Sequence, residues 1–182
     1  MSLTLRLAVP EDLPALRDLM NAAIGELLKP FLGPDAVAAS FDIMGLDSQL
    51  VADGTYFVVE DDGVLAGCGG WSRRATLFGG DHSAGRDAAL LDPSRDAARV
   101  RAMYTHPDHV RKGVGRMILQ ACESAAAGEG FSRCELAATL AGEPLYRACG
   151  YMEIERFSAA TSGGVDVPLV RMGKALPPAP AK

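Results

Sequence analysis

The chain has 182 residues, 48% of them hydrophobic and 23% charged, with a formal net charge of −5 at pH 7. These values fit one globular domain with a sizeable core. The negative charge argues against a general affinity for nucleic acid, which is bound through clustered Lys and Arg. No apolar stretch approaches the length of a membrane span, and the N-terminus lacks the pattern of a signal peptide, so we expect a cytoplasmic protein without a membrane partner.

The first fifty residues predict one strand followed by two helices. Residues 3–7 alternate apolar and polar side chains, which is typical of a half-buried strand. Pro10 and the two carboxylates after it suit the first turn of a helix, whose apolar residues recur at helical spacing until the chain nears Pro30. Residues 35–50 predict a second helix.

A hairpin and a long irregular segment follow. Residues 55–60 and 64–71 predict two strands joined by a turn at 61–63, and the glycines within the second strand indicate a bulge or a close approach by another element. Residues 72–96 are polar, glycine-bearing and without a period. Such a segment is either a loop that covers a substrate or a disordered insertion.

The second half alternates strands and helices. We expect strands at 97–105, 131–139, 151–157 and 165–174, helices at 114–128 and 145–149, and a disordered tail at 177–182. Strands flanked by helices in this order predict a mixed α/β sheet with helices on both faces.

A glycine-rich basic corner joins the strand at 97–105 to the helix that follows it. Gly113 and Gly115 let a ligand approach the backbone, and the first helical turn has free N–H groups. Basic side chains surround the corner: Arg111, Lys112 and Arg116. The corner therefore predicts a phosphate site. No Lys-Ser or Lys-Thr follows Gly115, which excludes a nucleoside-triphosphate P-loop, and the third glycine of a dinucleotide-binding turn is missing.

Two motifs carry a family resemblance. The order strand, His106-Pro107-Asp108, basic residues, Gly113-Val114-Gly115-Arg116 and apolar helix resembles the acetyl-CoA pyrophosphate loop of the GCN5-related N-acetyltransferases (GNAT). Residues 138–151, in which a short helix with a tyrosine ends at a glycine, resemble that family's late segment. The resemblance implies a single domain over residues 1–176, with a mixed, mostly antiparallel central sheet, helices on both faces, and a splay at the cofactor-binding strands.

The resemblance also implies an activity and a set of site residues. It implies transfer of an acetyl group from acetyl-CoA to a primary amine of a small molecule or an amino terminus, by direct attack in a ternary complex. Tyr146 matches the tyrosine that protonates the leaving thiolate, although it could instead only pack its helix or bind the sulfur. The implied contacts to acetyl-CoA come from Met103, Tyr104, Thr105, Arg111, Lys112, Gly113, Val114, Gly115 and Arg116. The early helical region would partly line the acceptor pocket, so three residues are candidates for pocket walls or for core packing: Phe31, Phe41 and Met44.

The sequence departs from the family pattern at the general base. Many members place a glutamate on the central strand, where this chain has Arg99, which cannot accept a proton. The remaining candidates are a water chain and four side chains: Glu135, His82, Asp42 and Asp47. An aromatic amine or an α-amino group has a lower pKa than an alkylamine, so its transfer would depend less on a general base.

Other features favour plain structural roles. The four cysteines lack C-x-x-C spacing and are expected to be reduced core thiols, and Trp71 is expected in the core. His106 and His109 have no third ligand nearby in the sequence, so we expect solvated side chains and no metal. The alternative to an enzyme is an acyl-CoA-binding regulatory module with little catalysis, and transfer of a longer acyl group or transfer to a protein lysine is a third possibility. The acceptor amine is not identified, and self-association as a homodimer is left open.

Overall fold

The computed structural model describes residues 1–181, which fold around one seven-stranded sheet. The strand order is β1-β2-β3-β4-β5-β7-β6, and only β4 and β5 pair in parallel. The strands are β1 (Leu3–Leu7), β2 (Tyr56–Asp61), β3 (Val64–Ser72), β4 (Ala98–Thr105), β5 (Arg133–Thr139), β6 (Met152–Ala159) and β7 (Val167–Ala175). This mixed, mostly antiparallel sheet confirms the predicted fold class.

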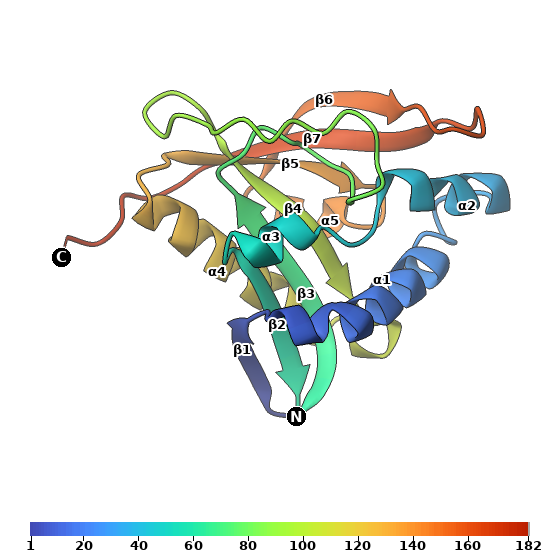
Figure 1. Cartoon of the computed structure of the whole chain (residues 1–182), viewed down its shortest axis with the longest axis horizontal. Helices are drawn as coiled ribbons and strands as arrows, with labels where there is room; N and C mark the ends of the chain where they lie inside the picture. Colours follow the sequence, from blue (N-terminus) through green and yellow to red (C-terminus); the bar gives the residue numbers. More distant parts are fainter. Residues whose placement is uncertain (182) are drawn as a thin grey trace.

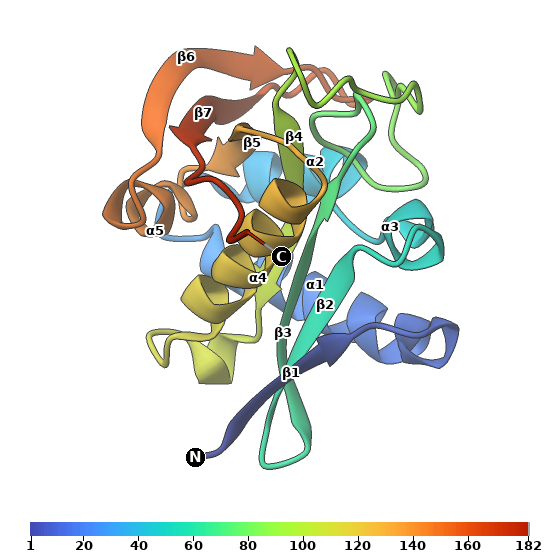
Figure 2. The same ribbon diagram turned by 90° about the vertical axis from the view of Figure 1, so that its left-hand side faces the viewer.

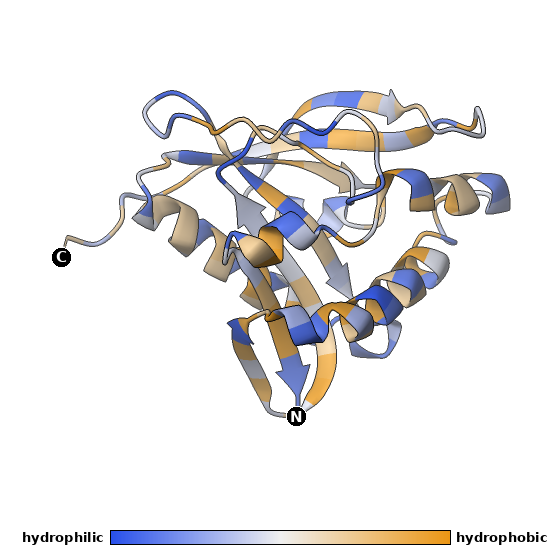
Figure 3. Ribbon diagram, viewed as in Figure 1, coloured by the Kyte–Doolittle hydropathy of each residue, from blue (hydrophilic) through white to orange (hydrophobic). Residues whose placement is uncertain are grey.

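Helices cover both faces of the sheet (Figures 1 and 2). They are α1 (Leu13–Leu27), α2 (Pro34–Ile43), α3 (Ser48–Ala52), α4 (Val114–Gly128) and α5 (Glu143–Ala148). On one face, α1 buries Leu16, Met20 and Ile24 in a core with strand residues such as Val58. On the other face, α4 buries its own apolar side in a second core. Figure 3 shows hydrophilic and hydrophobic residues alternating along α1, as a helix with one buried side requires.

The prediction of one helix over residues 35–50 is wrong. The structure has two helices there, separated by residues 44–47. Gly45 has a φ of 135°, which a helix cannot contain, and the Asp47 side chain accepts a hydrogen bond from the Gln49 N–H as the N-cap of α3. The apolar residues keep a helix-like spacing across residues 44–47, so the sequence pattern did not indicate the break.

Gly67 and Gly69 of β3 lie where side chains of α4 and β4 come close to the strand. A Cβ on Gly67 would stand 2.4 Å from a Val114 methyl, and one on Gly69 would stand 2.4 Å from the Met103 sulfur. The register of β3 against β2 also shifts, because Val59 and Glu60 are opposite Gly67 and Leu65, which leaves one extra residue in β3. Both the close approach and the bulge that the sequence predicted are therefore present.

Residues 72–96 form an irregular but internally bonded segment. The Thr76 N–H donates to the Asp87 carbonyl at 2.9 Å, and Arg74 and Leu90 form an isolated β-bridge. The segment is thus folded back on itself, unlike a disordered insertion.

The remaining elements follow the predictions to within a few residues. Trp71 is buried, with its ring edge-on to Phe131. Residues 177–181 have no regular structure and are exposed, and the last residue of the predicted tail, Lys182, lies outside the described residues. Within residues 1–181, no helix combines the length and apolarity needed to cross a membrane.

Candidate functional site

The sheet splits between β4 and β5. The two strands pair only at their beginnings, where Ala98 is opposite Cys134 and Arg99 is opposite Glu135. Beyond that point β5 continues alongside β7 while β4 turns away from it (Figure 1). A cavity of about 100 Å³ lies in the split and is lined on both sides by residues of the two strands.

A bulge in β4 shapes this cavity. Ala102 has a φ of 51°, a left-handed conformation that a residue with a Cβ seldom adopts. The Tyr56 hydroxyl, from β2, donates a 2.6 Å hydrogen bond to the Ala102 carbonyl and holds the bulge in place. No sequence signal marks this position, because alanine has no preference for such a conformation.

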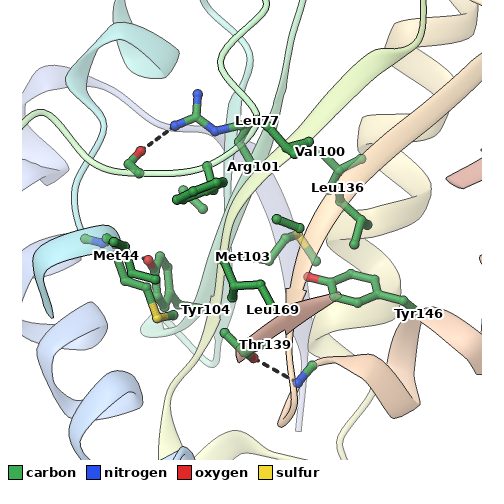
Figure 4. Close-up of a pocket in the computed structure, with 17 residues that line it drawn as sticks. Met44, Leu77, Val100, Arg101, Met103, Tyr104, Leu136, Thr139, Tyr146 and Leu169 are labelled. Carbon is green, nitrogen blue, oxygen red and sulfur yellow. Dashed lines mark hydrogen bonds between the residues drawn. The ribbon is translucent and has the colours of Figure 1, made fainter. Parts of the chain in front are cut away.

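Tyr146 of α5 forms one side of the cavity. Figure 4 shows its hydroxyl pointing toward Met103, with no hydrogen bond to the other lining residues that are drawn. Burial raises the pKa of this hydroxyl above its usual value, so it stays protonated. The helix ends because Gly150 adopts a φ of 93°, as the sequence predicted.

The glycine-rich corner lies at the start of α4. Gly113 is the N-cap residue with a φ of 86°, and Arg111 also has a positive φ, of 64°. The amides of residues 114–116 belong to the first helical turn and have no partner within the helix. These free N–H groups are what a phosphate would need.

The corner and α5 are packed together. A Cβ on Gly115 would lie 2.8 Å from a Leu145 methyl, so a larger residue there would push the Leu145 side chain aside. Leu145 immediately precedes Tyr146 in α5. The first turn of α4 therefore fixes the helix that carries Tyr146.

The opposite side of the cavity is apolar. It includes Met44, Leu77, Phe78 and Leu169, of which Leu77 and Phe78 come from the irregular segment. The Tyr104 hydroxyl accepts a 2.9 Å hydrogen bond from the Gly45 N–H and thereby holds the α2–α3 connection at the cavity.

Two of the three predicted wall residues lie elsewhere. Phe31 and Phe41 are 48% and 37% exposed, and neither lines the cavity nor belongs to the core. Phe31 lies in the turn that follows α1, and Phe41 lies on an exposed side of α2, which the hydrophobic pattern did not distinguish from a buried side. Only Met44 lies where it was predicted.

A buried ion network borders the cavity. Arg101 lines the cavity, and its Nη2 lies 2.8 Å from Asp47 Oδ2, while Arg86 Nη2 lies 3.0 Å from the other oxygen of the same carboxylate. Arg101 also donates to the Gly79 carbonyl. Burial lowers the pKa of the Arg101 guanidinium, and the nearby Asp47 charge opposes that shift. The network joins β4, the cap of α3 and the irregular segment.

A second carboxylate is held in the same way. Glu135 Oε2 lies 3.1 Å from Arg99 Nη1 and 3.0 Å from Arg171 Nε. The sequence alone does not connect these two residues. Arg99 stands where many family members have a glutamate base, and Glu135 is one of the alternative candidates for the base. The structure shows that they are partners, at the point where β4 and β5 still pair.

The other candidate bases also have partners. Asp42 accepts a 2.6 Å hydrogen bond from the Ser162 N–H, and bonding from Ser162 lowers the pKa of this carboxyl. A ring nitrogen of His82 lies 2.6 Å from the Phe41 carbonyl oxygen. None of the four candidate side chains is among the described residues that line the cavity.

The two histidines of the corner lie close together. The rings of His106 and His109 are 5.7 Å apart, and His109 Nε2 is 3.7 Å from Asp61 Oδ2. The His109 side chain is only 14% exposed, so the expectation of a solvated ring is wrong for this residue. Over residues 1–181, no group of three His, Cys, Asp or Glu is placed to hold a metal ion.

Comparisons with known proteins agree with this geometry. The family model described as "Acetyltransferase (GNAT) domain" matches residues 52–153, which is more than half of the chain. No curated protein matches the sequence.

Solved structures share the fold at low sequence identity. A GCN5-related N-acetyltransferase from Rhodopseudomonas palustris has a TM-score of 0.71 at 21% identity, with 97% of each chain covered. A putative acetyltransferase from Salmonella typhimurium with its cofactor acetyl-CoA has a TM-score of 0.64 at 19% identity, covering 100% of this chain and 98% of the other. An N-acetyltransferase from Thermoplasma acidophilum in complex with coenzyme A has a TM-score of 0.62 at 14% identity, covering 96% and 99%.

A seven-stranded sheet that splits between two parallel strands, beside a glycine-rich helix start, defines an acetyltransferase of the GNAT type. The chain belongs to the GNAT acetyltransferase family.

Proposed function

We propose that the protein is an acetyl-CoA-dependent N-acetyltransferase that transfers an acetyl group to a primary amine of a small molecule or an amino terminus. The observation that carries this proposal is the cavity in the β4–β5 split, which has Tyr146 on one side and the unpaired edge of β4 on the other. The free amides at the start of α4 lie beyond the end of the same strand.

The residues present suit acetyl-CoA. Backbone groups of Met103, Tyr104 and Thr105 on the β5 side of β4 would pair with the pantetheine arm as a neighbouring strand would. The amides of residues 113–116, with Arg111, Lys112 and Arg116 around them, would hold the pyrophosphate through N–H groups and positive charge. Two structural neighbours were solved with acetyl-CoA or coenzyme A, which supports the same ligand here.

Acetyl-CoA would supply a thioester carbonyl that the amine attacks directly in a ternary complex. Tyr146 would donate its proton to the leaving sulfur, because burial keeps its hydroxyl protonated and it has no fixed partner in the cavity. The apolar side at Met44 and Phe78 would exclude water from the thioester.

The volume of the cavity and the charge of its lining residues limit which acyl group and which acceptor fit. A space of about 100 Å³ leaves little room for an acyl chain longer than acetyl. An acceptor lysine on a protein would favour an acidic groove, whereas the only charged side chain among the described lining residues is Arg101. Both points favour acetyl transfer to a compact acceptor.

The second candidate function is an acyl-CoA-binding regulatory module with little catalysis. The observation that favours it is that no carboxylate or histidine is among the described lining residues. Isothermal titration with acetyl-CoA, followed by thiol release with a panel of amines, separates the two. Binding with turnover supports the enzyme, binding without turnover on any amine supports the module, and no binding contradicts both.

A further inference from the structure

The charge around the cavity limits which amine can enter it. Of the described residues that line it, Arg101, Tyr104 and Tyr146 are the only titratable ones, and both tyrosines are buried, which raises the pKa of their hydroxyls. No lining group of the described chain can therefore carry a negative charge near pH 7. An ammonium group would meet no counter-charge on the wall.

The nearest carboxylates are already neutralised. Asp47 lies between Arg101 and Arg86, and Glu135 lies between Arg99 and Arg171. In each cluster two arginines share one carboxylate, and in the second cluster Asp96 also acts on Arg99, so the excess positive charge is clearer for Arg101 and Arg86. A cationic acceptor would be repelled by Arg101 on the wall and would gain no ion pair, because both carboxylates are already paired.

A positive charge on the acceptor would also be costly to bury. Leu77, Phe78 and Met44 make part of the wall apolar, and the side-chain oxygens on it are the uncharged hydroxyls of Thr139, Tyr104 and Tyr146. A buried charge without a partner is strongly disfavoured. An alkylamine with a pKa of about 10.4 would have to enter as the neutral form, which is only about 1 molecule in 2,500 at pH 7.

We propose that the acceptor is a compact, apolar and weakly basic amine of the arylamine class, which enters the cavity already neutral. This inference rests on the proposed N-acetyltransferase function and narrows its acceptor. A wall without a negative charge and with apolar side chains such as Leu77 and Phe78 suits one small neutral ring better than a polyamine or an aminoglycoside, which carry several positive charges. The arginine clusters then serve as a barrier to cations.

The chemistry needs no carboxylate when the amine enters neutral. The nitrogen lone pair attacks the thioester carbonyl carbon, so that a C–N bond forms and the C–S bond breaks. The acylated nitrogen is strongly acidic and loses one proton. Tyr146 gives its proton to the departing sulfur and takes the proton from nitrogen, so the products are a neutral amide, free thiol and unchanged tyrosine.

The test compares two acceptors of the same carbon skeleton. At saturating acetyl-CoA and pH 7, kcat/KM is measured for 4-methylaniline, which is mostly neutral, and for 4-methylcyclohexylamine, which is mostly charged. We expect 4-methylaniline to be preferred by at least about 100-fold, with the ratio shrinking close to tenfold for each unit of rising pH as the alkylamine loses its charge.

A variant tests the role of the arginine clusters. Arg99→Gln leaves Glu135 with only Arg171 as its cationic partner and should narrow the preference for the arylamine severalfold. Arg133→Gln is the matched control, because Arg133 lies on the neighbouring strand β5 and its side chain donates to the Arg95 carbonyl, away from Glu135. An unchanged preference in Arg99→Gln with normal thermal stability would overturn the barrier role.

The outcomes separate the acceptor from the proposed function. Equal or better acetylation of the alkylamine overturns the acceptor class while the enzyme stands. Acetylation of a trialanine amino terminus but not of the arylamine does the same and points to a peptide acceptor. Binding of acetyl-CoA with no acceptor turned over also overturns the inference, whereas the absence of acetyl-CoA binding and of any transfer removes the proposed function itself.

Discussion

Arg101 of β4 and Asp47 at the cap of α3 form an ion pair of 2.8 Å whose side chains are only 3% and 1% exposed. Breaking a buried pair from one side leaves an uncompensated charge. We expect Asp47→Asn to lower the free energy of unfolding by about 3 kcal/mol, since Arg101 and Arg86 would lose their shared carboxylate. Urea denaturation measures this, and Asp62→Asn is the control because Asp62 is 66% exposed. If Asp47→Asn lowered the free energy of unfolding no more than Asp62→Asn does, the buried network would not stabilise the fold around the cavity.

Tyr146→Phe should lower kcat roughly 100- to 10,000-fold, which is the usual contribution of a positioned proton donor. Acetyl-CoA affinity should change little, because the backbone of β4 and the start of α4 supply the proposed contacts. Tyr151→Phe is a close control, since its ring lies 5.9 Å from that of Tyr146 but outside the lining of the cavity. Normal turnover in Tyr146→Phe would remove it as the proton donor.

Gly113→Val should raise the Kd for acetyl-CoA about tenfold. The native φ of 86° is left-handed, and a residue with a Cβ loses about 1–2 kcal/mol there, so the amides at the helix start would be displaced. Gly128→Val is the control at the opposite end of α4, where a Cβ would meet nothing within 4 Å. Titration calorimetry and thermal melting together distinguish lost binding from lost folding. Equal affinities in the two variants would place the phosphates elsewhere.

Most elements could be predicted because their patterns are local. Apolar spacing in α1 and α4, the turn at Asp62-Gly63 and the end of α5 at Gly150 each depend on a few neighbouring residues. The corner at the start of α4 could be predicted for the same reason. The left-handed bulge at Ala102 could not, because it is held by the Tyr56 hydroxyl from another strand.

The two ion networks could not be predicted, because their partners are far apart in the sequence. Asp47 and Arg101 are far apart in the sequence and meet only because the fold brings the cap of α3 to Arg101. Two arginines at alternate positions of an otherwise apolar strand, Arg99 and Arg101, were the available signal, since buried charges need partners. That signal says a partner exists but does not say which carboxylate it is.

The activity toward 4-methylaniline should be nearly independent of pH from 6.5 to 9. Burial raises the pKa of both Tyr104 and Tyr146 from its usual value of 10.0, so both hydroxyls remain protonated through this range. Arg101 stays charged throughout it. A steady-state pH profile of kcat/KM measures this. A tenfold rise per unit between pH 6.5 and 8 would instead reveal a general base that the cavity does not contain.

Asp53 should make stability depend on pH in acid. The Arg74 guanidinium donates to both of its oxygens and lowers the pKa of this carboxyl from the 3.8 of the unfolded chain. The stabilisation is therefore complete above pH 3.8 and is lost as the pH falls through the lower folded value. We expect Asp53→Asn to be less stable than the wild type by about 1–2 kcal/mol at pH 7. The difference should shrink below pH 3.8, and a difference in urea midpoints that stays constant down to pH 2 would contradict this assignment.

The most direct test of the account is calorimetric titration of acetyl-CoA into the wild-type protein and Gly113→Val, with thiol release followed on adding 4-methylaniline. We expect one site per chain in the wild type, weaker binding in the variant, and thiol release that requires the amine. No binding to the wild type, or equal binding to both proteins, would contradict the assignment of the β4–β5 split and the start of α4 as the acetyl-CoA site.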